Sequence, residues 1–115
     1  MANVKVEADQ LVLELTVEEK LEAIHGDIRV PLSAVLSVTV VDDALDQVQG
    51  IRTGTGLPGV LVVGTIRWAG RKSFVVVHHG HPRGVVIRLE GTEFDEFVIG
   101  TDDPEKMAAG LPVLT

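Results

Sequence analysis

The second half of the sequence alternates short β-branched and aliphatic runs with turn residues, and this pattern constrains the fold more than any other feature. From Gly50 onward, turn signals recur about every eight to twelve residues, a spacing typical of small β sandwiches and barrels. Val60–Trp68 is the strongest predicted strand. Ala69-Gly70 is predicted to form the hairpin turn before the return strand Lys72–His78. The sequence therefore predicts a mainly β domain.

Further strands are predicted by the same criteria at Leu11–Leu15, Ile28–Val30, Val35–Val41, Val85–Leu89 and Phe94–Ile99. The glycine-rich segment Gly50–Gly59 is expected to be a loop, preceded by one helical turn over Ala44–Val48. Short turns join the last four strands, which are therefore expected to be antiparallel neighbours. The prediction totals seven strands.

Two short helices are expected. Thr16 and Glu19 have capping-box spacing, and an apolar face follows at Val17, Leu21 and Ile24. This helix would end near Gly26 and would turn its charged residues to water: Glu18, Glu19, Lys20 and Glu22. The second helix is expected to begin at Asp102-Asp103-Pro104-Glu105 and to end before Gly110 and Pro112.

The chain has 115 residues, of which 45% are hydrophobic, and this amount suits one domain (1–115) with one core. It contains one Trp and three Phe, so the core must consist mainly of Val, Leu and Ile. We expect Trp68 to cover the core rather than to form an exposed contact.

The formal net charge is −7, from ten Lys and Arg against seventeen Asp and Glu. This balance argues against nucleic-acid binding and against charge-driven binding to anionic membranes. Cysteine is absent, which excludes disulfides, thiolate metal sites and a cysteine nucleophile. The N-terminal residues lack the apolar core of a signal peptide, so a cytoplasmic location is expected.

One motif has the letters of a dinucleotide-binding loop: Gly54-Thr55-Gly56-Leu57-Pro58-Gly59. A dinucleotide site needs a helix after this loop, because the helix N-terminus holds the pyrophosphate. Here strand-forming residues follow from Val60, and Pro58 removes a backbone donor. We therefore expect an inter-strand loop and no cofactor.

The densest group of potential metal ligands is His78-His79-Gly80-His81. Adjacent strand residues point to opposite faces, so His78 and His79 do not easily share an ion. A turn at Gly80 could bring His79 and His81 together, with further ligands supplied from elsewhere. The preferred interpretation is a solvated hairpin end without a metal.

The carboxylates form several groups, mostly at helix starts and turns where capping explains them: Glu18, Glu19 and Glu22; Asp42, Asp43 and Asp46; Glu93, Asp95 and Glu96; Asp102 and Asp103. None of the three serines (Ser33, Ser37 and Ser73) lies in a nucleophile elbow. Basic residues of the second half suggest a weak anion-binding face or ordinary charges paired with Glu90, Glu93 or Glu96: Arg52, Arg67, Arg71, Lys72, Arg83 and Arg88. No catalytic residue is predicted.

The segments Arg29–Val35 and Ser37–Val40 resemble the strand-turn-strand entry of bacterial PH-like domains. Gly59–Trp68, the Gly70–Val77 hairpin and Asp102–Glu105 are similar to small actinobacterial-type proteins of this kind. The resemblance implies a seven-stranded, partly open antiparallel barrel with a C-terminal helix, acting in binding or scaffolding. Inositol-phosphate binding is not implied, because the region after the first strand is acidic.

The expected function is a non-catalytic binding or assembly module whose exposed edge strands pair with a protein partner or a second copy. The alternative is a small-anion binder or metal-dependent enzyme that uses the His79/His81 turn and nearby arginines. A structural domain without any ligand is a third possibility, which sequence does not distinguish from the first.

Overall fold

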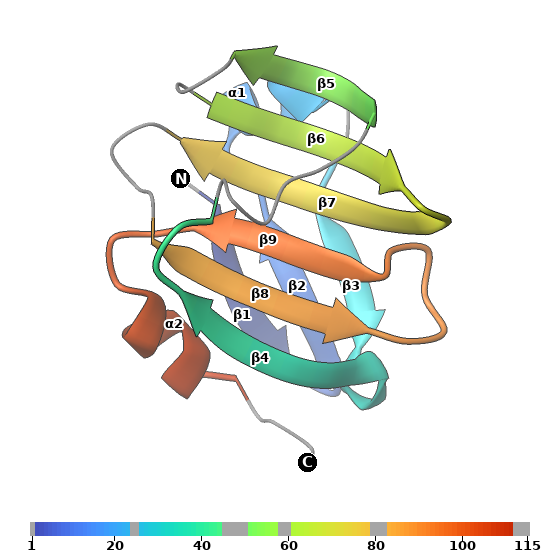
Figure 1. Cartoon of the computed structure of the whole chain (residues 1–115). Coiled ribbons are helices and arrows are strands. Elements are labelled where there is room, and N and C mark those ends of the chain that lie inside the picture. The colour runs from blue at the N-terminus through green and yellow to red at the C-terminus, as the bar shows by residue number, and fades with distance from the viewer. Residues whose placement is uncertain (1, 24–25, 45–50, 58–60, 79–82, 112–115) are drawn as a thin grey trace.

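The computed structural model describes residues 2–23, 26–44, 51–57, 61–78 and 83–111. Nine strands, two α-helices and one 3-10 helix are assigned in these ranges (Figure 1). In chain order they are β1 (Asn3–Glu7), β2 (Gln10–Glu14), α1 (Val17–Ala23), β3 (Ile28–Pro31), η1 (Leu32–Ala34), β4 (Val35–Val41), β5 (Ile51–Leu57), β6 (Leu61–Trp68), β7 (Arg71–His78), β8 (Gly84–Leu89), β9 (Glu96–Gly100) and α2 (Pro104–Ala109). The expectation of a mainly β chain is confirmed.

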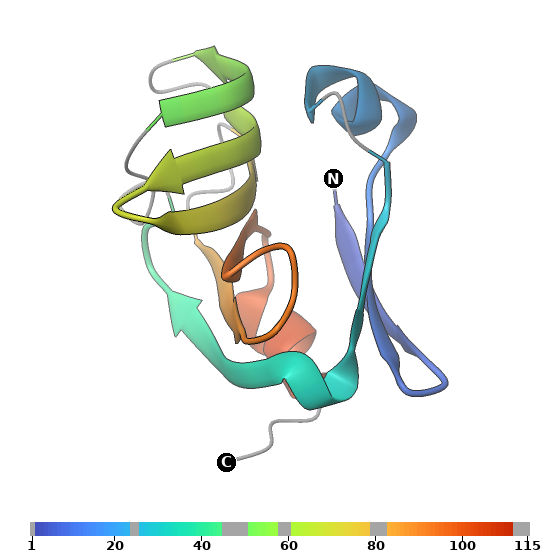
Figure 2. The ribbon, with the colours of Figure 1, turned by 90° about the vertical axis from the view of Figure 1, so that its right-hand side faces the viewer.

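The strands form two sheets that lie face to face. One sheet has the order β1-β2-β3, and the other has the order β4-β8-β9-β7-β6-β5. The strands of the smaller sheet run across those of the larger one (Figure 1), and Figure 2 shows the two layers edge-on, joined through η1. No strand pairing among the described residues joins the two sheets into a closed barrel.

The main core fills the space between the sheets. Leu11, Leu13 and Val30 of the smaller sheet belong to the same buried cluster as Ile87 and Ile99 of the larger one. The cluster also contains the three phenylalanines, each at most 1% exposed: Phe74, Phe94 and Phe97. The ring centroids of the first two lie 5.5 Å apart in an edge-on arrangement, which is favourable for aromatic pairs.

A second apolar cluster covers the opposite face of the larger sheet. It comprises Ile66, Val75, Val77, Val86 and Val98, together with Ala44 beyond β4. The middle strands of this sheet are therefore buried on both faces. This explains why their sequences are continuous apolar runs rather than alternating ones.

The observed order of the strands in the larger sheet differs from the predicted order. β6–β7 and β8–β9 are antiparallel neighbours, as expected. However, β9 lies between β7 and β8 and runs parallel to β7, so the expected β7–β8 neighbourhood is wrong. Phe97, Val98 and Ile99 are at most 1% exposed, and a strand that is apolar on both faces is best accommodated in the interior of a sheet.

The seven-strand prediction is also wrong, because it omits β1 and β5. β1 pairs with β2 through a tight turn in which Ala8 has φ 54°, a conformation that glycine usually signals. Gly54–Leu57, expected to be loop, belongs to β5 and pairs with β6 in continuous antiparallel register. The neighbouring strand supplies the pairing that the local glycines disfavour.

Helix α1 has its predicted capping box but not its predicted orientation. Val17, expected on the apolar face, is 73% exposed, whereas Glu19, expected in water, is 1% exposed. The carboxylate of Glu19 accepts the N–H of Thr16 at the start of the helix and contacts His78 on β7 of the larger sheet. These bonds turn Glu19 inward and leave Val17 in solvent. The helix follows the second strand rather than the first.

The C-terminal helix is confirmed as α2, with Pro104 in its first turn and Asp103 as N-cap. Most of the expected helical turn Ala44–Val48 and the side chain of Trp68 lie outside the described part of the structure. Within the described ranges, neither helix is long and apolar enough to cross a bilayer.

Candidate binding surface

The structure connects one member of the histidine cluster to the acidic helix α1. Nε2 of His78 lies 3.0 Å from Oε2 of Glu19, while Oε1 of Glu19 accepts the N–H of Thr16 at 2.9 Å. The N–H of Glu19 in turn donates to Oγ1 of Thr16 at 3.2 Å, which completes the capping box. No local sequence pattern predicts the Glu19–His78 contact, because fifty-nine positions separate the two residues.

A carboxylate that orients an imidazole supplies two of the three members of a catalytic triad, and the third member is a nucleophile. Ser73 is on the same strand as His78, but five residues of extended chain separate them by about 17 Å. Ser37 belongs to β4, at the far edge of the same sheet. Neither of these two serines completes a triad at His78, and the Glu19–His78 contact joins α1 to the larger sheet.

His79 and His81, the metal ligands of the alternative interpretation, lie outside the described residues. Among the residues that are described, no group of three or more potential ligands is close enough to hold a metal ion.

Several basic residues of the expected anion-binding face are paired with carboxylates. Nζ of Lys72 lies 2.8 Å from Glu93, and Arg71 lies 3.3 Å from Glu96. Arg83 binds Glu105, and this bond raises the pKa of the guanidinium and lowers the pKa of the carboxyl. The predicted pairing with Glu93 or Glu96 is thus confirmed for Lys72 and Arg71, whereas Arg83 is paired with Glu105, which was not among the expected partners.

The acidic groups also have local structural roles. Asp103 accepts the N–H of Lys106 at 3.1 Å as the cap of α2, and Asp95 accepts the N–H of Lys72 at 2.7 Å. The capping explanation is therefore confirmed for Glu19 and Asp103.

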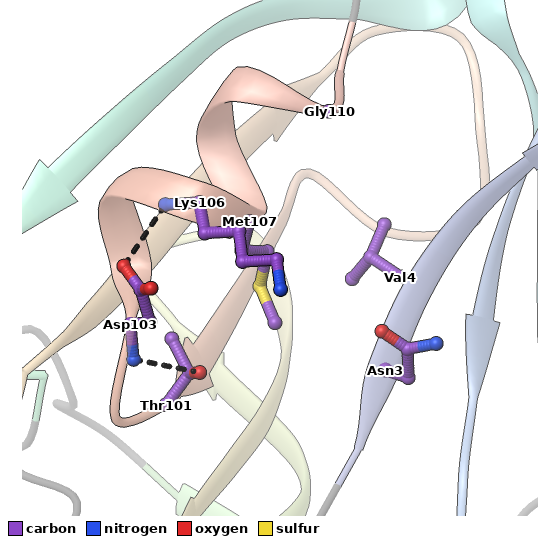
Figure 3. Close-up of a pocket in the computed structure, with 7 residues that line it drawn as sticks. All are labelled: Asn3, Val4, Thr101, Asp103, Lys106, Met107 and Gly110. Atoms are coloured by element: carbon purple, nitrogen blue, oxygen red, sulfur yellow. Dashed lines mark hydrogen bonds between the residues drawn. The ribbon is translucent and has the colours of Figure 1, made fainter.

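A pocket of about 330 Å³ lies between β1 and α2 (Figure 3). It is lined by Asn3, Val4, Thr101, Asp103, Lys106, Met107 and Gly110. Lys106 and Asp103 are its charged lining residues, and Val4 and Met107 add apolar surface. These groups suit a small polar molecule but select no particular class of ligand.

The β4 edge, defined as Val35–Val41 at the free side of β4, indicates one type of partner more clearly than the pocket does. β4 pairs with β8 on one side, and no described strand pairs with its other side. Leu36 is 48% exposed and Val40 is 36% exposed, although both are large apolar side chains. An unpaired strand edge with exposed apolar residues is a template for pairing with another chain.

The other sheet edges carry residues that discourage such pairing. β1 presents Lys5, which forms ion pairs with Glu7 at 2.7 Å and Glu14 at 3.2 Å. β3 contains Arg29 and Pro31, and the sequence of β5 contains Arg52. β4 has neither charge nor proline, and its one register irregularity is confined to the Val35–Ser37 end, so Ser37–Val41 carries none of these protective features.

Comparisons of the chain with protein-family models, with curated proteins and with solved structures find no match.

Proposed function

We propose that this protein is a non-catalytic binding module that associates through the β4 edge, with a second copy of itself as the first partner to test. The observation that carries this proposal is an uncharged, seven-residue edge strand with two exposed apolar side chains. Strand addition at such an edge supplies main-chain hydrogen bonds, while the side chains supply specificity.

The chemistry of the remaining surface supports a binding role over catalysis. Neither Ser73 nor Ser37 lies beside the Glu19–His78 pair, and Arg71 and Lys72 of β7 are paired with carboxylates. In the pocket beside α2, the carboxylate of Asp103 caps the helix and the hydroxyl of Thr101 accepts the N–H of Asp103, so both groups have structural roles.

We also propose a PH-like architecture for the chain. Two facing sheets followed by the C-terminal helix α2 support this relation. The nine described strands and the parallel β7–β9 pair depart from a simple seven-stranded antiparallel barrel. PH-like domains mostly act in binding, which agrees with the proposed role.

The proposal is tested by measuring the mass of the protein by light scattering over a wide range of concentrations. Wild type is expected to shift towards twice the chain mass as concentration rises, and Leu36→Lys is expected to remain monomeric because an edge lysine opposes strand pairing. The matched control is Val6→Lys, since Val6 is also on an edge strand and is 39% exposed.

Val6→Lys should associate as wild type does, and thermal unfolding should show that both variants are folded. Wild type that stays monomeric at the highest concentration would show that self-association is wrong. If Leu36→Lys and Val6→Lys change the association equally, the interface does not lie at the β4 edge.

A further inference from the structure

The residue types of β4 read the same in both directions. From Val35 to Val41 they are apolar, apolar, hydroxyl, apolar, hydroxyl, apolar and apolar. The centre of this pattern is Val38, which is also the middle residue of the strand. A two-fold axis pairs residues that are equally distant from its centre, so this pattern places similar side chains opposite one another.

On this basis we infer that β4 pairs antiparallel with β4 of a second copy, about a two-fold axis at Val38. The inference rests on the proposed self-association and adds its strand direction and register. Leu36 then lies opposite Val40 of the other copy, and Ser37 lies opposite Thr39. The two exposed apolar side chains of each β4 edge are thereby covered by the same pair from the second copy.

This register uses the whole strand. Val35 lies opposite Val41, so each of the seven residues faces a residue of the second strand, with the Val35–Ser37 irregularity at either end of the pair. Moving the centre to Thr39 would leave Leu36 beyond the end of the partner strand and would set Ser37 against Val41. Apolar and hydroxyl side chains would then face each other, and one of the two exposed apolar residues would remain uncovered.

The backbone of β4 is suited to such pairing. Ser37–Val41 pairs in unbroken register with Arg88–Gly84 of β8, and the irregularity in β4 is confined to the Val35–Ser37 end. β4 is the outermost strand on its side of the larger sheet (Figure 1). Pairing at this position extends the two larger sheets into one continuous sheet.

Charge favours the antiparallel direction. Asp42 and Asp43 follow β4 directly. The side chain of Asp42 is 98% exposed, and its Oδ1 lies 3.8 Å from Nε of Arg83, which compensates part of its charge. Parallel pairing would place each carboxylate beside its own copy, which is unfavourable for directly opposed like charges. Antiparallel pairing about Val38 instead separates the two Asp42 residues by eight positions, about 26 Å along the strands.

The absence of cysteine from the chain allows a direct test by disulfide cross-linking. Opposed residues of antiparallel strands have Cα atoms about 4.5–5.5 Å apart, which is within the range of a disulfide. Val38→Cys is therefore expected to form covalent dimers on mild oxidation. Leu36→Cys and Val40→Cys should each stay largely monomeric alone, because each lies about 14 Å from its own copy.

Mixing Leu36→Cys with Val40→Cys should produce the mixed dimer. This pair tests the register independently, which matters because Val38 packs against the core and its substitution could impair folding. Thr39→Cys is the matched control for a register displaced by one residue. Melting curves under reducing conditions establish that each variant is folded.

Faster cross-linking of Thr39→Cys than of Val38→Cys would overturn the register. Efficient cross-linking of every single variant would indicate parallel strands. A wild-type dimer that yields neither the Val38→Cys dimer nor the mixed dimer would overturn this inference alone. A wild-type monomer would overturn the proposed self-association as well.

Discussion

The buried carboxylate of Glu19 offers the sharpest test of how α1 is held. Glu19→Ala removes the acceptor of the Thr16 N–H, 2.9 Å away, and the partner of His78 Nε2, 3.0 Å away. Loss of a capping interaction costs about 1 kcal/mol, and loss of a hydrogen bond to a charged group costs about 1.5–3 kcal/mol. We expect the free energy of unfolding to fall by roughly 3 kcal/mol.

Urea unfolding followed by circular dichroism measures this change. With an m-value of about 1.5 kcal/mol/M, the midpoint should decrease by about 2 M. Glu19→Gln should fall between wild type and Glu19→Ala, because its amide oxygen can still accept the Thr16 N–H while the charge facing His78 is lost. Glu18→Ala, one residue earlier on an exposed position, should change stability by only about 0.5 kcal/mol.

Comparing Glu19→Ala with Glu18→Ala tests whether the buried carboxylate stabilises α1. If Glu19→Ala shifts the midpoint no further than Glu18→Ala, the buried carboxylate does not stabilise α1 in the way its contacts indicate.

Three further predictions concern two backbone positions and the loss of stability at low pH. Gly84→Ala would place Cβ 2.3 Å from the backbone oxygen of Ile99. It should therefore lower the free energy of unfolding, measured in urea, by about 1–3 kcal/mol or more. The control Gly26→Ala, whose Cβ would have no atom within 4 Å, should be nearly neutral. Ala8→Gly should stabilise by about 1 kcal/mol in the same assay, because Ala8 has φ 54° in its turn; an unchanged midpoint would contradict this. The N–H of Leu15 donates to Asp27 and lowers the pKa of its carboxyl, so this stabilisation is present above pH ~4 and is lost as the pH falls through the lowered pKa. Asp27→Asn should therefore be less stable at pH 7 and should lose less stability on acidification; parallel pH profiles of the two proteins would refute the assignment.

Local sequence signals were reliable where the chain determines its own conformation over a few residues. The Ala69-Gly70 turn, the Thr16–Glu19 capping box and the start of α2 all follow from side chains and glycine placed within one turn of their partners. The β1–β2 turn was missed because Ala8 occupies a left-handed conformation without the glycine that usually marks it.

The sequence predicted the type of binding surface, an exposed edge strand, but not which strand forms it. The sequence indicated that exposed edge strands could pair with another chain, but it did not show which strands would lie at an edge. Val35–Val41 and Phe94–Ile99 are both apolar segments, yet β4 lies at the edge of the sheet and β9 lies near its middle. Strand order depends on pairings between distant segments, which local patterns do not encode.

The mainly β character of the chain, the capped helix near each end and the absence of cysteine chemistry could all be read from the sequence. These properties follow from composition and from contacts between near neighbours. Three features became visible only in the folded chain: β9 separates β7 from β8, Glu19 is buried against His78, and β4 presents Leu36 and Val40 to solvent. Strand order and burial depend on contacts between residues that are distant in the chain. Glu19 therefore lies beside its distant partner His78, although the local helical pattern places it in water.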